Sequence, residues 1–103
     1  MDTERIFAYR ALRIARNDQT PMPGFEQNDY IPFCNAVERS GESIIAEYES
    51  VRNSTIALFE NMNAEDWERI GEASGSPVSA LALGYMIAGH ELHHIQLLHE
   101  RYF

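Results

Sequence analysis

The chain has 103 residues, a formal net charge of −8 and 45% hydrophobic residues. This length fits a single domain, residues 1–103, and the excess of acidic residues argues against binding to nucleic acid or to an anionic membrane by bulk electrostatics. The single cysteine, Cys34, excludes an intramolecular disulfide and suits a reducing compartment. Because we see no signal peptide and no apolar stretch long enough to span a bilayer, we expect a cytoplasmic protein.

A first helix is predicted from about residue 3 to residue 16. Asp2 is its expected N-cap, and Glu4 lies in the first turn, where a negative charge is favourable. Apolar residues that include Ile6 and Ile14 share one side of this helix. Four arginines make the helix basic within an acidic chain, and the simplest expectation is that they are solvated and pair with acidic neighbours.

Residues 17–34 are predicted to form a long crossover loop. Three of the four prolines lie in this segment and prevent a long helix. When extended, the segment could travel about 50 Å, which is enough to return along the first helix and start the next helix parallel to it. Phe25, Tyr30 and Phe33 are expected to pin the loop to the bundle.

A second helix is predicted from about residue 36 to residue 62. Asn35 is its expected N-cap, with Glu38 completing a capping box. Because Ser40 and Gly41 weaken the first turns, the alternative is a start nearer Ser43. Residues spaced alternately by four and three form a bundle seam. The seam consists of Val37, Gly41, Ile44, Tyr48, Val51, Thr55, Leu58 and Met62.

The rest of the chain predicts a corner and a third helix. Residues 63–67 read as a capped single turn with Trp67 packed inward, and residues 71–75 break the chain. Ser76 as N-cap and Pro77 at the first helical position then open a helix over about residues 77–101. No strand is convincing, so the expected fold class is all-α, with three main helices.

All four histidines lie in the third predicted helix, and His90 and His94 are four residues apart. Side chains at this spacing share one face of a helix, within reach of a single metal ion such as zinc or nickel. Leu83 and Ile87 lie on the same stripe, so both imidazoles are expected to point inward. The alternative is two buried histidines that form ordinary hydrogen bonds. The run from His90 also matches the His-Glu-x-x-His pattern of metalloproteases, but those folds need a third ligand downstream or a sheet beside the helix.

Three stretches resemble the DinB-like superfamily of metal-binding helical bundles: residues 2–13, residues 17–30 and residues 88–94. The resemblance implies an up-down-type four-helix bundle with a long connection between its second and third helices. It also implies a metal held by three histidines, two of them at the positions of His90 and His94.

The resemblance also implies a departure, because the family's first helix and its first ligand histidine have no counterpart in residues 1–103. A third ligand would then come from Asp2, Glu4, the terminal amine or a partner chain. Three helices built to surround a core with a fourth leave an apolar groove open, so a homodimer is expected, each copy covering the groove of the other.

Three functions follow as expectations. The first is a DinB-like protein with a partial divalent-metal site, dimeric and with little or no catalysis. The second is a metal-dependent S-transferase or hydrolase that activates a thiol or water, with Tyr9, Arg10 or Arg13 orienting a small thiol or anionic substrate. The third is a structural or regulatory interaction protein without a metal. The residues leave open whether the chain is an enzyme.

Overall fold

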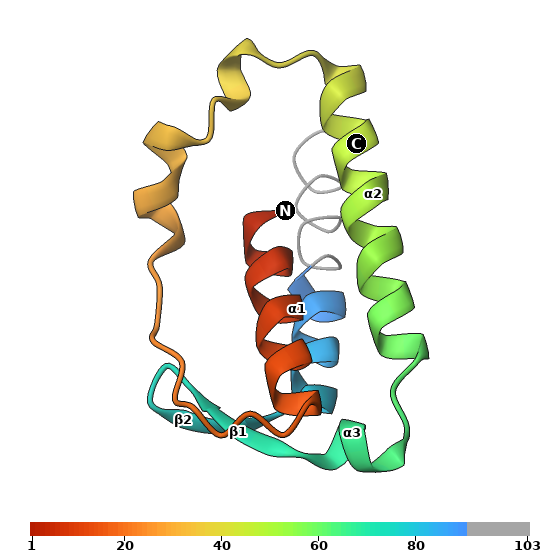
Figure 1. The fold of residues 1–103 in the computed structure, drawn as a ribbon. Coiled ribbons are helices and arrows are strands. Elements are labelled where there is room, and N and C mark those ends of the chain that lie inside the picture. The colour runs from red at the N-terminus through yellow and green to blue at the C-terminus, as the bar shows by residue number, and fades with distance from the viewer. Residues whose placement is uncertain (91–103) are drawn as a thin grey trace.

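The computed structural model describes residues 1–90 of the chain (Figure 1). Two long helices and the start of a third stand side by side, and a short corner with a two-stranded hairpin closes one end. No helix in this part of the chain is long and apolar enough to cross a membrane. The elements are helix α1 (Asp2–Ala15), the 3-10 helices η1 (Gln27–Phe33) and η2 (Ala36–Glu38), helices α2 (Gly41–Glu60) and α3 (Ala64–Glu68), strands β1 (Ile70–Ala73) and β2 (Ser76–Ser79), and a helical segment over residues 80–90.

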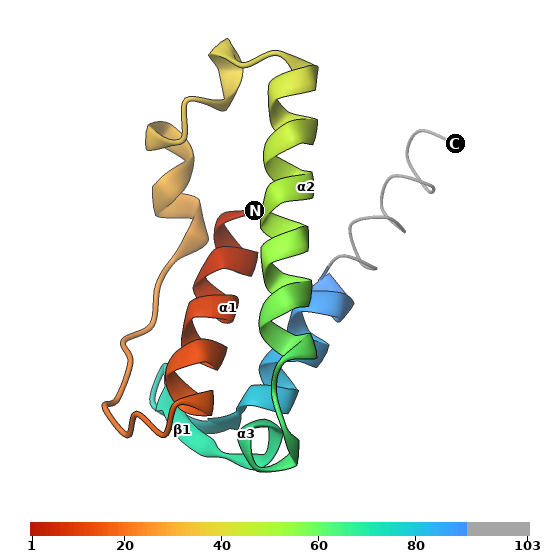
Figure 2. The same cartoon turned by 45° about the vertical axis from the view of Figure 1, so that its right-hand side comes forward.

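Helix α1 confirms the first predicted helix to within one residue at each end. The N-cap is Met1 rather than Asp2, which is itself the first helical residue. Figures 1 and 2 show that the connection climbs back along α1, so that α1 and α2 run parallel, as expected, while the segment 80–90 runs in the opposite direction.

Aromatic contacts attach only the first part of the crossover loop to the bundle. Phe25 packs edge-to-face on Phe7 of α1, with ring centroids 6.4 Å apart, and Tyr30 lies 6.0 Å from Phe25. Phe33 is 81% exposed, so the prediction that it also pins the loop is wrong. The loop carries η1 beyond Phe25, and this 3-10 helix has no buried residue.

The second predicted helix is interrupted near its start. Asn35 adopts a left-handed conformation (φ 58°) and does not cap a long helix; only the short η2 follows it. Helix α2 begins at Gly41, where the Ser40 side chain accepts a hydrogen bond from the Ser43 N–H at 3.1 Å. The prediction that Asn35 and Glu38 form a capping box at the start of a 36–62 helix is therefore wrong. The chain turns at Asn35 and again before α2 starts at Gly41.

The predicted corner is confirmed by α3. Asn63 and Asp66 form a reciprocal capping box, in which each side chain accepts a hydrogen bond from the backbone N–H of the other. Trp67 then stacks on Phe59 of α2, with ring centroids 5.1 Å apart. The corner therefore ties the C-terminal end of α2 to the hairpin that follows.

A β-hairpin lies where no strand was expected, so the purely all-α class is wrong for residues 70–79. Strands β1 and β2 pair antiparallel, with Ile70 opposite Ser79. Ser74 and Gly75 form the turn with φ values of 54° and 79°. Two-residue turns with positive φ at both positions match the twist of antiparallel strands, which explains why the predicted break became a hairpin.

The third helix starts later than predicted. Ser76 and Pro77 lie in β2, where Pro77 faces Glu72 in a sheet that has only edge strands and so tolerates a residue without an N–H. The helical segment begins at residue 80, and its cap is Ser79, whose Oγ accepts a hydrogen bond from the Ala82 N–H at 3.0 Å. Residues 91–103 of the predicted helix lie outside the described residues.

The hairpin turn gives a first prediction. Gly75→Ala is expected to lower the free energy of unfolding by about 1 kcal/mol, because an L side chain is disfavoured at positive φ. Gly41→Ala is the matched control, since it opens α2 at an ordinary φ with free space around it and should not destabilise. Urea denaturation of both variants checks the prediction. Equal stability of the two variants would contradict it.

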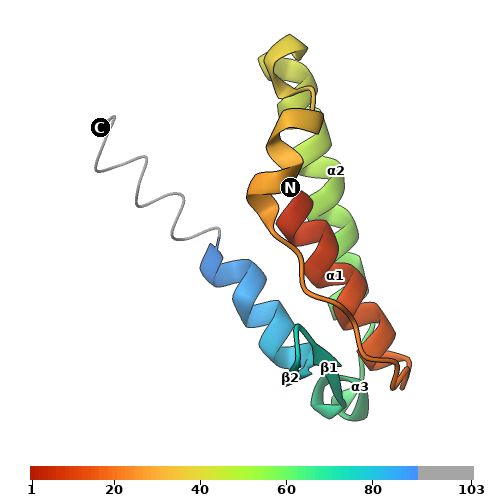
Figure 3. The same cartoon turned by 90° about the vertical axis from the view of Figure 1, so that its left-hand side faces the viewer.

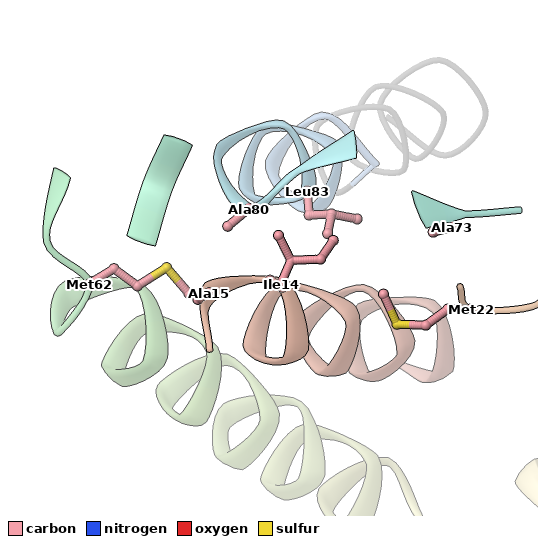
Figure 4. Close-up of a cluster of buried hydrophobic side chains, with 8 residues drawn as sticks. Ile14, Ala15, Met22, Met62, Ala73, Ala80 and Leu83 are labelled. Carbon is pink, nitrogen blue, oxygen red and sulfur yellow. The ribbon is translucent and has the colours of Figure 1, made fainter. Parts of the chain in front are cut away.

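The hydrophobic core lies at the hairpin end of the bundle (Figure 4). Ile14 of α1 and Leu83 of the segment 80–90 point toward one another, and both are 1% exposed. The predicted seam of α2 is buried at Val51, Thr55 and Met62 but not at Val37. The core also contains Ala11, Ala15, Met22, Met62, Ala73 and Ala80.

Candidate metal centre

His90 lies at the last described position of the segment 80–90 and lines a cavity of about 210 Å³. Three parts of the chain meet there: the beginning of α1, the middle of α2 and the segment 80–90. The other lining residues are Met1, Thr3, Glu4, Phe7, Tyr48, Arg52 and Ile87. The cavity therefore joins one imidazole to a carboxylate, a phenol and a guanidinium from two other helices.

The predicted inward stripe is only partly buried. Leu83 and Ile87 are buried, whereas His90 is exposed although it lines the cavity. Figure 3 shows the reason: the segment 80–90 starts against the core and then leans away from α1 and α2. The cavity is thus open to solvent at His90. His94, the second predicted ligand, lies outside the described residues.

Glu4 is held by α2 through an ion pair and three hydrogen bonds. Arg52 donates from Nη2 to Oε1 at 2.7 Å and from Nε to Oε2 at 3.2 Å, and the Thr55 hydroxyl donates to Oε2 at 2.7 Å. Burial by itself raises the pKa of Glu4, but the bonds from Arg52 and Thr55 outweigh it and place the pKa below 4.5. Glu4 therefore stays ionised, and its oxygens are already committed.

The structure distinguishes the candidates for a third metal ligand by whether they line the His90 cavity. Glu4 lines the His90 cavity with a carboxylate that is engaged elsewhere, and Met1 lines it as well, whereas Asp2 does not. Within residues 1–90, no group of three His, Cys, Asp or Glu side chains is placed to hold a metal ion. His90 and Glu4 therefore form at most an incomplete ligand set.

The residues expected to orient a substrate have other roles. Arg10 is buried and donates hydrogen bonds to the Pro23 carbonyl at 2.8 Å and to Ser74, which locks the crossover loop and the hairpin turn onto α1. The guanidinium of Arg13, 5.6 Å from the ring centroid of Tyr9, also pairs with Asp18 and holds the pKa of that carboxyl well below its usual range. None of Tyr9, Arg10 and Arg13 lines the His90 cavity.

Sequence reasoning missed the contribution of α2 to this cavity. Tyr48 and Arg52 both line it, with the Arg52 guanidinium 5.7 Å from the centroid of the Tyr48 ring. Thr55, within an otherwise largely apolar seam, was the available signal, because a buried hydroxyl needs a partner. The Thr55 hydroxyl lies 3.0 Å from the Val51 carbonyl one turn earlier and 2.7 Å from Glu4 on α1. No local pattern identifies Glu4 as a partner.

These elements define the class of protein as a helical bundle with a long crossover and one small hairpin. The sequence model of the DinB superfamily matches residues 1–98 of the chain. The chain therefore belongs to the DinB superfamily, as the resemblance implied. No curated protein and no solved structure matches it.

Proposed function

We propose that this DinB-superfamily protein binds one divalent metal ion, zinc or nickel, through His90 and His94, with little or no catalysis of its own. The observation that carries the proposal is the position of His90 on a solvent-accessible cavity where three parts of the chain converge. His94 follows at the spacing that lets two imidazoles of one helix reach the same ion.

The ligand set supports binding rather than chemistry. A metal ion with an open position would activate a bound water or thiol. The ion pair with Arg52 keeps the Glu4 carboxylate from acting as an additional ligand or as a general base. The remaining ligands would then come from the terminal amine of Met1, which lines the cavity, from outside the described residues or from a second chain. An ion held this way is positioned less rigidly than catalysis requires.

The metal proposal is tested by adding zinc to metal-free protein and following binding by calorimetry and bound metal by mass spectrometry. His90→Ala and His94→Ala are each expected to weaken zinc binding by about 100-fold or more, because even loss of an outer partner of a ligand costs roughly 10–100-fold. The effect should appear for each variant separately, since both imidazoles bind one ion.

His93→Ala and His99→Ala are the matched controls, because they remove an imidazole from the same ten-residue run without removing a proposed ligand. Both should bind zinc as the unaltered protein does. Equal losses in all four variants would mean that the run binds zinc without a defined site. Binding unaffected by His90→Ala would remove the proposal.

A further inference from the structure

A second, larger hollow lies between α2 and the segment 80–90, and its aromatic residues Phe59 and Trp67 also pack against the hydrophobic core. This apolar groove has a volume of about 500 Å³ and contains the stacked rings of Phe59 and Trp67. Gly84 lies directly against them, since a Cβ there would be 3.3 Å from the Phe59 ring. Large apolar side chains therefore line a depression that no other described element covers.

Large apolar side chains at the rim of the apolar groove are exposed to water, which is unfavourable for a monomer in solution. Ile56, Leu81 and Tyr85 line it and are 45%, 42% and 72% exposed, and Met86 beside them is 47% exposed. Single exposed apolar residues are ordinary, but a contiguous cluster over a hollow marks an interaction surface. The cluster lies on α2 and on the first turns of the segment 80–90.

The distribution of charge identifies the occupant. Residues 76–90 contain no Asp, Glu, Lys or Arg in a chain that carries a net charge of −8. Two acidic copies repel one another over most of their surfaces and can approach closely only across a charge-free face. A basic partner would gain little here, because among residues 1–90 the groove is lined by one carboxylate, that of Glu60, and Arg52 is already paired with Glu4.

We propose that a second copy of this chain covers the apolar groove, in an isologous dimer whose segments 80–90 pair across a twofold axis. Leu81 and Tyr85 are four residues apart and therefore form one ridge of the helix. In an antiparallel pair, Tyr85 lies opposite Leu81 of the partner subunit, so each ridge fills the groove of the other copy. Exposed apolar area is removed from water without bringing the acidic surfaces together.

The dimer also covers one wall of the His90 cavity, because Arg52 and Ile87 line both hollows. The two proposals nevertheless stand on different observations: the dimer on an apolar groove beside an uncharged helical segment, and the metal on histidines. Measuring association in the presence of a chelator keeps them separate, since loss of metal binding then has no influence on the result.

Sedimentation velocity over a range of protein concentrations tests the proposal. The unaltered protein should sediment at twice the monomer mass, and Leu81→Glu and Tyr85→Glu should each raise the dimer dissociation constant by about 30-fold or more, the loss typical of a central interface residue. Ile70→Glu is the matched control: Ile70 is 60% exposed on β1, outside the groove, and its replacement should leave the dimer intact.

A mixing experiment tests the pairing itself. Leu81→Glu and Tyr85→Lys should each be monomeric alone, and their mixture should recover a dimer, because the new charges face one another across the twofold axis. Far-ultraviolet circular dichroism of each variant verifies that it folds. A monomer at every concentration, a dimer insensitive to both substitutions, or a mixture without recovery would overturn the proposal. A monomer whose groove binds an apolar peptide instead would also overturn it.

Discussion

Ile14→Ala is expected to lower the free energy of unfolding by about 3 kcal/mol, because Ile14 is a large side chain at the centre of the core. Ile14 is 1% exposed and meets Leu83 at the centre of the core, so its loss leaves a cavity between α1 and the segment 80–90. Ile70→Ala removes the same atoms from a 60% exposed position and should cost much less. Urea denaturation measures both, and equal costs would contradict the core described above.

Gly71 provides an independent check on the same contact. A Cβ at Gly71 would lie 2.6 Å from Cγ1 of Ile14, too close for any real pair of atoms. Gly71→Ala should therefore destabilise the unaltered protein by about 1–3 kcal/mol through overpacking. In the Ile14→Ala background, the nearest clashing atoms are gone and most of this cost should disappear. A double-mutant cycle with no coupling would show that the two residues do not touch.

Glu4→Gln is expected to lower the free energy of unfolding by about 2 kcal/mol at pH 7, because it weakens charge-assisted hydrogen bonds from Arg52 and Thr55. The Glu4 side chain is 13% exposed and that of Arg52 is 24% exposed, so solvent screens their interaction only in part. The substitution also removes the ionised carboxylate that Arg52 pairs with on α1. Thermal and urea denaturation at pH 7 measure the loss.

The effect of Glu4→Gln on the free energy of unfolding should also depend on pH. Because the pKa of Glu4 is lowered in the folded protein, its stabilisation is complete above the ordinary value of 4.5 and is lost as the pH falls through the folded pKa. The difference in stability between the unaltered protein and Glu4→Gln should therefore shrink below about pH 4.5. Glu49→Gln, at an exposed glutamate of α2 without an ion pair in the described part of the chain, is the control. A difference that stays constant with pH would contradict the ion pair.

Patterns among neighbouring residues were sufficient to predict those elements whose conformation depends on neighbouring residues. Apolar spacing predicted α1, α2 and the helical segment 80–90, because helical periodicity depends on neighbouring residues. It did not predict where the third helix starts. The capping box of Asn63 and Asp66 predicted α3 for the same reason. The prolines of residues 17–34 predicted a long crossover. The pairing of His90 with His94 at one metal ion stays a prediction from spacing, because His94 lies outside the described residues.

Tertiary contacts decided what those patterns left open. Pro77 has the local signature of a helix start, but pairing of β2 with β1 and of Met22 with Ala73 holds it in a strand. Thr55 has a local partner in the Val51 carbonyl, but its other partner is a carboxylate 51 residues away, which no local rule can supply. The exposure of His90 depends on the angle at which the segment 80–90 leaves the core and diverges from α1 and α2. Pairings between distant segments depend on packing of the whole chain, so only the folded structure determines them.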